Sequence, residues 1–197
     1  MGYCVDLHIC VNKENLPILY SCDEVYMYMF TCSNRSEDIV YTYINDIKIG
    51  DWWDRVKKAI KQCKEYHWIM VGEDGEQSED YNVKPMMSVT TTVDVPSKIG
   101  EINLTSCKLH QEVLNVLKLA LPKEYIIDSN YIVHTSDCVG YEYVYAGYVY
   151  SIDNKAYITK EDGIGNNAYY RSVIELLDKN YLLLPIKEDT YEIKYKP

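Results

Sequence analysis

The sequence predicts an α+β protein built from two similar β-rich units with largely antiparallel sheet and a connecting helix. Three observations predict this fold class. Tyr, Val and Ile alternate with polar residues in many short segments, which is typical of strands. Apolar residues recur at helical spacing in three longer segments. Blocks from the first half of the chain also recur, in the same order, in the second half.

The recurrence joins four pairs of blocks. These are YCVDLHICV (3–11) with YIIDSNYIV (125–133), EVYMYMF (24–30) with YVYAGYVY (143–150), YINDIKIGDWWDRVKKAI (43–60) with YITKEDGIGNNAYYRSVIELL (157–177), and WIMVGED (68–74) with LLPIKED (183–189). The common unit is three strands, a helix and a strand (βββαβ), followed by a final strand. We therefore predict an internal duplication with 1–100 as the first unit, 101–122 as the connecting helix and 123–197 as the second unit. One fused globular domain is the alternative.

Three helices are expected from the spacing of apolar residues. The first spans about 51–66, begins at Asp51 as N-cap, and carries lysines on its polar face. The second is the connecting helix over 105–122, which Pro122 ends. The third spans 168–179 and follows the glycine-containing loop GIGNN (163–167).

Charge and cysteine content restrict the class of partner and the compartment. The chain has 30 acidic and 20 basic residues, a formal charge of −10 that repels nucleic acid and anionic membranes and favours partners with basic surfaces. Its seven cysteines include no CxxC pair, which indicates reduced thiols. The sequence begins without the features of a signal peptide and contains no run of about 18 apolar residues. We expect a cytoplasmic protein, in the host cytoplasm if the chain is viral.

An acidic loop is the densest negative patch of the sequence. It runs from 72 to 82 and lacks the ligand spacing of an EF-hand. A solvated loop is one interpretation, and steering of a basic protein partner is the other. The partner-binding residues expected here are Glu73, Asp74, Glu76, Glu79 and Asp80.

Tyrosine is strongly preferred over phenylalanine, with 21 Tyr and one Phe in the chain. Strand propensity alone predicts a mixture of the two, so we expect many rings to keep a wet or hydrogen-bonded hydroxyl, as recognition surfaces do. Five tyrosines crowd the segment 139–150, where a bulge at Ala146-Gly147 would bring them to one face. The partner-binding tyrosines expected here are Tyr141, Tyr143, Tyr145, Tyr148 and Tyr150.

A second candidate site begins on the first expected strand. Cys4, Asp6, His8 and Cys10 alternate there, so their side chains share one face. Thiol, imidazole and carboxylate groups suit zinc or a cysteine nucleophile. Isoleucines stand at both cysteine positions in the second unit, which indicates buried thiols, no metal site and no catalytic role.

Both units retain an aspartate in this block, which serves a shared site or satisfies a buried backbone group. If it serves a site, a groove where the units meet is the natural place for a small anionic, nucleotide-like ligand. The residues expected to line this groove are Asp6, His8, Asp128, Asn130, Lys57 and Lys61.

Other motifs predict no cofactor and no familiar enzyme. His134-Thr135-Ser136 matches half of the arrangement in two-histidine phosphoesterases, but the second tripeptide is missing. GIGNNAYY (163–170) lacks the third glycine of a dinucleotide-binding motif and the lysine of a P-loop. LPKEY (121–125) resembles a short motif of bacterial toxin-immunity proteins but covers only five residues, so no family is assigned.

Together these features predict a non-enzymatic binding protein that occupies and inhibits a macromolecular partner with a basic surface. Immunity proteins and phage-encoded inhibitors of host defence are the settings that its small size and acidity suggest. The alternatives are a small-ligand binding protein and an enzyme without a familiar motif.

Overall fold

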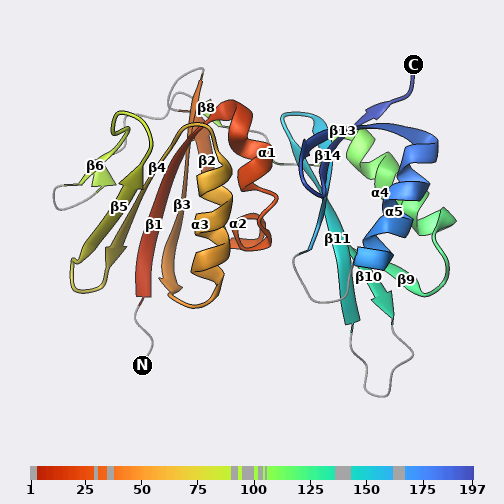
Figure 1. Ribbon diagram of the computed structural model, residues 1–197, viewed down its shortest axis with the longest axis horizontal. Helices are drawn as coiled ribbons and strands as arrows, with labels where there is room; N and C mark the ends of the chain where they lie inside the picture. The colour runs from red at the N-terminus through yellow and green to blue at the C-terminus, as the bar shows by residue number, and fades with distance from the viewer. Residues whose placement is uncertain are drawn as a thin grey trace. The chain divides into compact units, whose positions relative to one another are not determined.

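The chain forms two compact units, each with its own sheet (Figure 1). The computed structural model describes residues 4–28, 31–34, 38–89, 93–94, 100–101, 104, 106–135, 143–161 and 167–197. The units are Met1–Ile102 and Asn103–Pro197. Every strand pair described is antiparallel, so the α+β class with antiparallel sheet is confirmed. Within these ranges, no helix has the length and apolar character needed to cross a membrane.

The sheet of the first unit has six strands in the spatial order β5-β4-β1-β3-β2-β8. They are β1 (Cys4–Asn12), β2 (Thr31–Asn34), β3 (Ile39–Lys48), β4 (Tyr66–Gly72), β5 (Gln77–Tyr81) and β8 (Gly100–Glu101). The central strand β1 buries Val5, Leu7 and Ile9 on one side of the sheet, as strand alternation requires. A separate two-stranded sheet contains β6 (Ser88–Val89) and β7 (Val93–Asp94).

The helices of the first unit include one long helix that packs on the sheet. They are η1 (Lys13–Asn15), α1 (Leu16–Leu19), α2 (Asp23–Tyr28) and α3 (Trp52–Gln62). Trp53 of α3 meets Trp68 of β4 edge to face, with ring centroids 4.9 Å apart. Trp68 pairs with Ile9 of β1, so α3 covers the side of the sheet on which Ile9 is buried.

The boundaries of α3 follow from local bonds. Asp51 stands at the N-cap as predicted, although its side chain makes no capping bond. The helix ends four residues before the predicted end at 66 because Cys63 is extended, with ψ of 139°. The Lys64 N–H then donates to Oδ1 of Asn15 at 3.2 Å and so anchors the chain to η1.

The segment 24–30 was predicted as a strand, and this prediction is wrong. Its first part belongs to α2, and the neighbouring strand, β2, begins only at Thr31. Asp23 and Glu24 lie in the first turn of α2, where they interact favourably with the helix dipole. Glu24 also forms an ion pair with Arg55 of α3. The apolar residues of the segment 24–30 alternate over too few positions to distinguish a helix from a strand.

The sheet of the second unit also has six strands, in the order β13-β14-β12-β11-β10-β9. They are β9 (Tyr125–Asp128), β10 (Tyr131–Thr135), β11 (Tyr143–Ile152), β12 (Lys155–Lys160), β13 (Tyr181–Lys187) and β14 (Thr190–Tyr195). Asp153 and Asn154 have positive φ and form the tight turn between β11 and β12.

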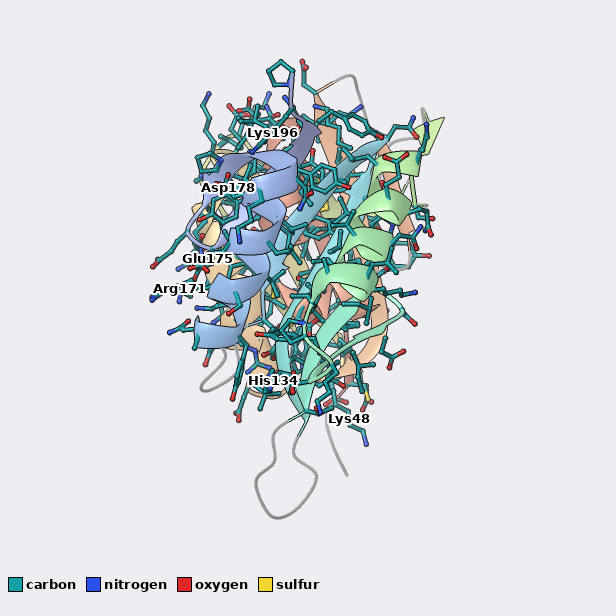
Figure 2. All side chains as sticks on the ribbon, turned by 90° about the vertical axis from the view of Figure 1, so that its right-hand side faces the viewer. Lys48, His134, Arg171, Glu175, Asp178 and Lys196 are labelled. Atoms are coloured by element: carbon teal, nitrogen blue, oxygen red, sulfur yellow. The ribbon has the colours of Figure 1, made fainter. Side chains whose placement is uncertain are left out.

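Two helices, α4 (Lys108–Ala120) and α5 (Asn167–Asn180), lie side by side on one face of this sheet (Figures 1 and 2). Val113 and Leu117 of α4 and Val173 of α5 are fully buried against Val149 and Ile158 of the sheet. The helix predicted as a connector over 101–122 thus contributes, as α4, to the core of the second unit. The Lys196 ammonium donates to the Asp178 carbonyl at 2.6 Å and caps the end of α5.

The segment 125–133 was predicted as one strand, but it forms the β9–β10 hairpin. Ser129 has φ of 54° and lies in the turn between the two strands. The two sheets also differ in strand order. In the first unit the strand after α3 is β4, which lies inside the sheet between β5 and β1. In the second unit the strand after α5 is β13, which lies at the edge of the sheet beside β14. The structure therefore does not confirm the internal duplication.

Candidate functional site

The predicted acidic loop is an ordered hairpin between β4 and β5, and β5 is an edge strand of its sheet. The Gly72 N–H donates to the Glu76 carbonyl at 2.8 Å, and the Gly75 N–H donates to the Gly72 carbonyl at 2.9 Å. Gly75 adopts φ of 76°, a conformation that side chains rarely tolerate. The chain has no basic residue between His67 and Lys84, so the hairpin carries only negative charge.

Three of the five carboxylates, those of Glu73, Glu79 and Asp80, are tied to the fold. Glu73 accepts the N–H of Cys4 at 3.2 Å. Asp80 accepts the Tyr66 hydroxyl at 3.3 Å and lies 3.9 Å from the Lys61 ammonium. Burial, and then the Asp80 carboxylate, raise the pKa of Tyr66, so its hydroxyl stays a neutral donor.

The other two carboxylates are free to meet a partner. Asp74 and Glu76 are exposed, and neither makes a side-chain bond to any residue that the structure describes. These two groups can therefore be changed without removing a contact of the fold.

A buried histidine that the sequence did not single out anchors the hairpin. His67 of β4 is fully buried, and its Nδ1 accepts the N–H groups of Met86 and Met87 at 2.9 and 3.0 Å. Because Nδ1 accepts both bonds, the proton resides on Nε2, which lies 3.3 Å from Oε2 of Glu79. His67 thus joins β4, β5 and the segment that follows β5. The role of His67 depends on contacts with residues distant in the chain, so the sequence alone does not reveal it.

Asp6 and His8 lie on the opposite side of the sheet from α3, because they alternate with Leu7 and Ile9. Nδ1 of His8 lies 2.8 Å from the Tyr41 hydroxyl, and the imidazole stacks near Tyr41 and Tyr43 with centroids about 6 Å away. Burial lowers the pKa of His8, and the Asp6 carboxylate opposes this change. Burial therefore favours the neutral form of the imidazole.

The cysteines of this face are not arranged as a metal site. Cys10 is fully buried in a small cluster with Tyr41, Ile69 and Met87, as predicted for a thiol that acts as a small hydrophobe. Among the described residues, no group of three His, Cys, Asp or Glu side chains is placed to hold a metal ion.

Within the first unit, the residues predicted for the ligand groove lie on both sides of the sheet. Lys57 and Lys61 belong to α3 and are therefore separated from Asp6 and His8 by the sheet. Lys57 instead lies over the Trp53 ring at 5.3 Å. Asp128 and Asn130 lie in the second unit at the β9–β10 turn, where the Asn130 carbonyl accepts the Val149 N–H at 2.9 Å.

Tyr145, Tyr148 and Tyr150 of β11 join a row of neighbouring rings on the face of the sheet opposite α4 and α5. The register shifts near Gly147, where a bulge would bring the tyrosines to one face, and Tyr145 and Tyr148 then share the face of Val133 and Tyr131. The row runs Tyr145, Tyr131, Tyr148, Tyr150, Tyr157, with successive centroids 5.6, 5.5, 5.7 and 5.3 Å apart.

Exposure differs sharply along this row. Tyr148 and Tyr150 are buried, whereas Tyr145 is 44% exposed. Of the three members of the predicted set whose side chains the structure describes, Tyr145 is thus the one that an external partner can reach. Tyr141 lies outside the described residues, and so does the side chain of Tyr143.

A groove of about 920 Å³ lies in the second unit between the N-terminal end of α4, the β11–β12 turn and β14. Its charged residues are Lys108, Glu112, Lys155, Glu192 and Lys194. Two of the lysines lie close to glutamates, Lys108 to Glu112 at 3.6 Å and Lys194 to Glu192 at 3.4 Å. Lys155 makes no side-chain bond to a residue that the structure describes.

A tyrosine closes one side of this groove. The Tyr195 hydroxyl donates to Oε2 of Glu112 at 2.7 Å. This hydrogen bond is the main cause that raises the pKa of Tyr195 to about 12. The sequence did not predict this groove, because its walls come from segments far apart in the chain.

His134 is packed between aromatic rings. It stacks on Tyr169 with centroids 3.8 Å apart and meets Tyr125 edge to face at 4.8 Å. Figure 2 shows His134 at one end of the second unit's sheet. Ser136 and residues 162–166 lie outside the described part of the chain, and α5 begins at Asn167, within one residue of the predicted start.

Comparison of the chain with protein-family models, curated proteins and solved structures found no match.

Proposed function

We propose that this chain is a non-enzymatic binding protein that occupies a basic surface of a protein partner and thereby inhibits it. The observation that carries the proposal is the β4–β5 hairpin, which presents Asp74 and Glu76 to solvent beside three anchored carboxylates. A dense negative patch on a rigid hairpin accelerates encounter with a positive surface.

Two exposed aromatic residues supply apolar contact area at different places. Tyr81 of β5 and Tyr145 of β11 are each 44% exposed. Tyrosine offers a large rigid ring with a polar tip, which suits a protein interface. Tyr81 follows directly on the acidic run, so the same hairpin supplies both charge and apolar contact.

The setting that we propose is that of an immunity protein or a phage-encoded inhibitor of a host defence protein, acting in the cytoplasm. Both classes act by stoichiometric occupation of a partner, which needs no cofactor and no catalytic residue. Nucleic acid and anionic membranes are disfavoured as direct partners by the formal charge of −10.

Native mass spectrometry tests this function. The tagged protein is purified gently from lysate of its own source and its mass is measured without denaturation. We expect a stoichiometric increase of tens of kilodaltons that disappears at high salt, because screening weakens contacts between exposed charges. A protein that is recovered alone, or with only a small molecule bound, contradicts the proposal.

A small anionic ligand is the second candidate function, and the groove beside α4 favours it. Three lysines line a space large enough for a nucleotide, and Lys155 has no carboxylate partner among the described residues. Such a ligand should raise the melting temperature of the wild-type protein and have less effect on Lys155→Gln. Equal shifts for Lys155→Gln and the wild type would exclude this groove as the site.

A further inference from the structure

We propose that the outer edge of β5 pairs with an extended basic segment of the partner, which becomes one more strand of the first unit's sheet. This inference rests on the proposed function and specifies how the acidic hairpin holds its partner. It predicts recognition through main-chain hydrogen bonds as well as charge.

The hydrogen-bond alternation of the hairpin defines which backbone groups of β5 face outward. The Asn82 N–H donates to the Tyr66 carbonyl, and the Gly72 N–H donates to the Glu76 carbonyl. In an antiparallel pair, bonded positions alternate with unbonded ones. Asn82 and Glu76 are thus both bonded to β4, and every second residue between them is bonded as well. The backbone groups of Ser78 and Asp80 therefore form hydrogen bonds with β4.

The remaining residues of β5 direct their backbone groups away from β4. These residues are Gln77, Glu79 and Tyr81. Within the described part of the chain, β4 is the only strand hydrogen-bonded to β5, and no hydrogen bond is made by the backbone N–H and C=O groups of these three residues. In Figure 1 β5 forms one edge of the first unit's six-stranded sheet, and β6 of the separate two-stranded sheet is drawn on that side. An edge of this kind is a template for another strand.

Charge selects which strand the edge accepts. Glu76, Glu79 and Asp80 line β5 or adjoin it, and the chain as a whole carries −10. A second copy of this acidic chain is therefore repelled, whereas Lys or Arg side chains of an added strand meet carboxylates across the pair. The occupant is an extended segment in which basic residues alternate with small or β-branched ones and which contains no proline.

Two peptides test the pairing with the full-length protein. The first is an acetylated and amidated peptide in which Lys alternates with Thr. The second is identical except for N-methyl groups on two adjacent central residues, which remove a donor from each edge and keep the charge. Fluorescence anisotropy at low ionic strength measures the affinity of each. We expect the methylated peptide to bind up to about tenfold more weakly, since the hydrogen bond that it loses to β5 is worth up to a factor of about ten.

Two variants of the protein test the same edge from the other side. Gln77→Pro removes an outward N–H where edge strands tolerate proline, and Gln77→Ala removes the same side chain but keeps the N–H. We expect Gln77→Pro to bind the unmethylated peptide about tenfold more weakly than the wild type does. Gln77→Ala should bind this peptide with the affinity of the wild type. Fluorescence of the three tryptophans, which all lie in the first unit, verifies that both variants are folded.

The outcomes separate this inference from the proposed function. Equal binding of both peptides, or of both variants, overturns strand pairing and leaves charge steering intact. Failure of both peptides to bind also overturns the inference, because the alternating Lys and Thr residues have the pattern proposed for the segment that β5 accepts. The proposed function fails independently, through native mass spectrometry that recovers no macromolecular partner.

Discussion

Several tyrosine hydroxyls form polar links within both units that phenylalanine could not make. The hydroxyl of Tyr66 bonds Asp80, and that of Tyr195 bonds Glu112. The Tyr170 hydroxyl donates to the Asp189 carbonyl at 2.7 Å, in a site where burial raises its pKa. The expectation of hydrogen-bonded rings is confirmed for these residues, because phenylalanine at each position would leave the partner without its donor.

Replacement of His67 should destabilise the first unit. His67→Phe leaves the buried N–H groups of Met86 and Met87 without an acceptor, at a cost of about 1–3 kcal/mol each. Urea unfolding followed by tryptophan fluorescence measures the loss. His67→Asn, which retains an acceptor, is the matched control and should lose less. An equal loss in both variants would argue against the two N–H bonds as the source.

His8 should make the first unit less stable in mild acid. The fold lowers the pKa of His8 below its usual 6.5, mainly by burial, so the unfolded chain binds the proton more readily. Stability is therefore retained above about pH 6.5 and lost as the pH falls through the lowered value. The urea midpoint of the wild type should fall more than that of His8→Gln between about pH 7.5 and about pH 5.5. Identical pH dependence in the two proteins would contradict this account.

At the scale of elements, length decided what the sequence could predict. The α3 and α5 helices have 11 and 14 residues, and both were located because several turns of apolar spacing are distinctive. The α2 helix has only six residues, and its alternating apolar residues also fit a strand. The β9–β10 turn was missed because Ser129 and Asn130 interrupt the alternation for only two residues.

Gly147 is required by the close approach of β12 to β11. A Cβ atom at this position would overlap the carbonyl oxygen of Thr159 on the neighbouring strand β12. Gly147→Ala should therefore destabilise the second unit by about 2–4 kcal/mol, because backbone must move to relieve the contact.

Hydrogen exchange of the β11 and β12 amides is the suitable measurement, since no tryptophan lies in the second unit. Gly50→Ala, where a Cβ meets only the Trp52 ring at 3.4 Å, is the control and should change little. Unchanged protection in Gly147→Ala would show that the strands can separate at no cost.

At the scale of the whole molecule, composition indicated a candidate surface but not its geometry. The acidic run was visible in the sequence as a loop, and the structure shows it as an ordered hairpin at a sheet edge. The anchoring by His67 and the outward backbone groups of β5 depend on contacts between distant residues. The groove beside α4 was hidden for the same reason.

Matched charge variants test whether the β4–β5 hairpin steers the partner. Asp74→Asn/Glu76→Gln removes two charges from the hairpin. Glu175→Gln/Asp178→Asn removes two from the exposed side of α5, where Figure 2 labels both residues. The measurement is the association rate with the captured partner as a function of ionic strength. We predict that the hairpin variant associates several-fold more slowly at low salt with a flatter salt dependence, whereas the α5 variant matches the wild type. Equal rates for the two variants would contradict the account.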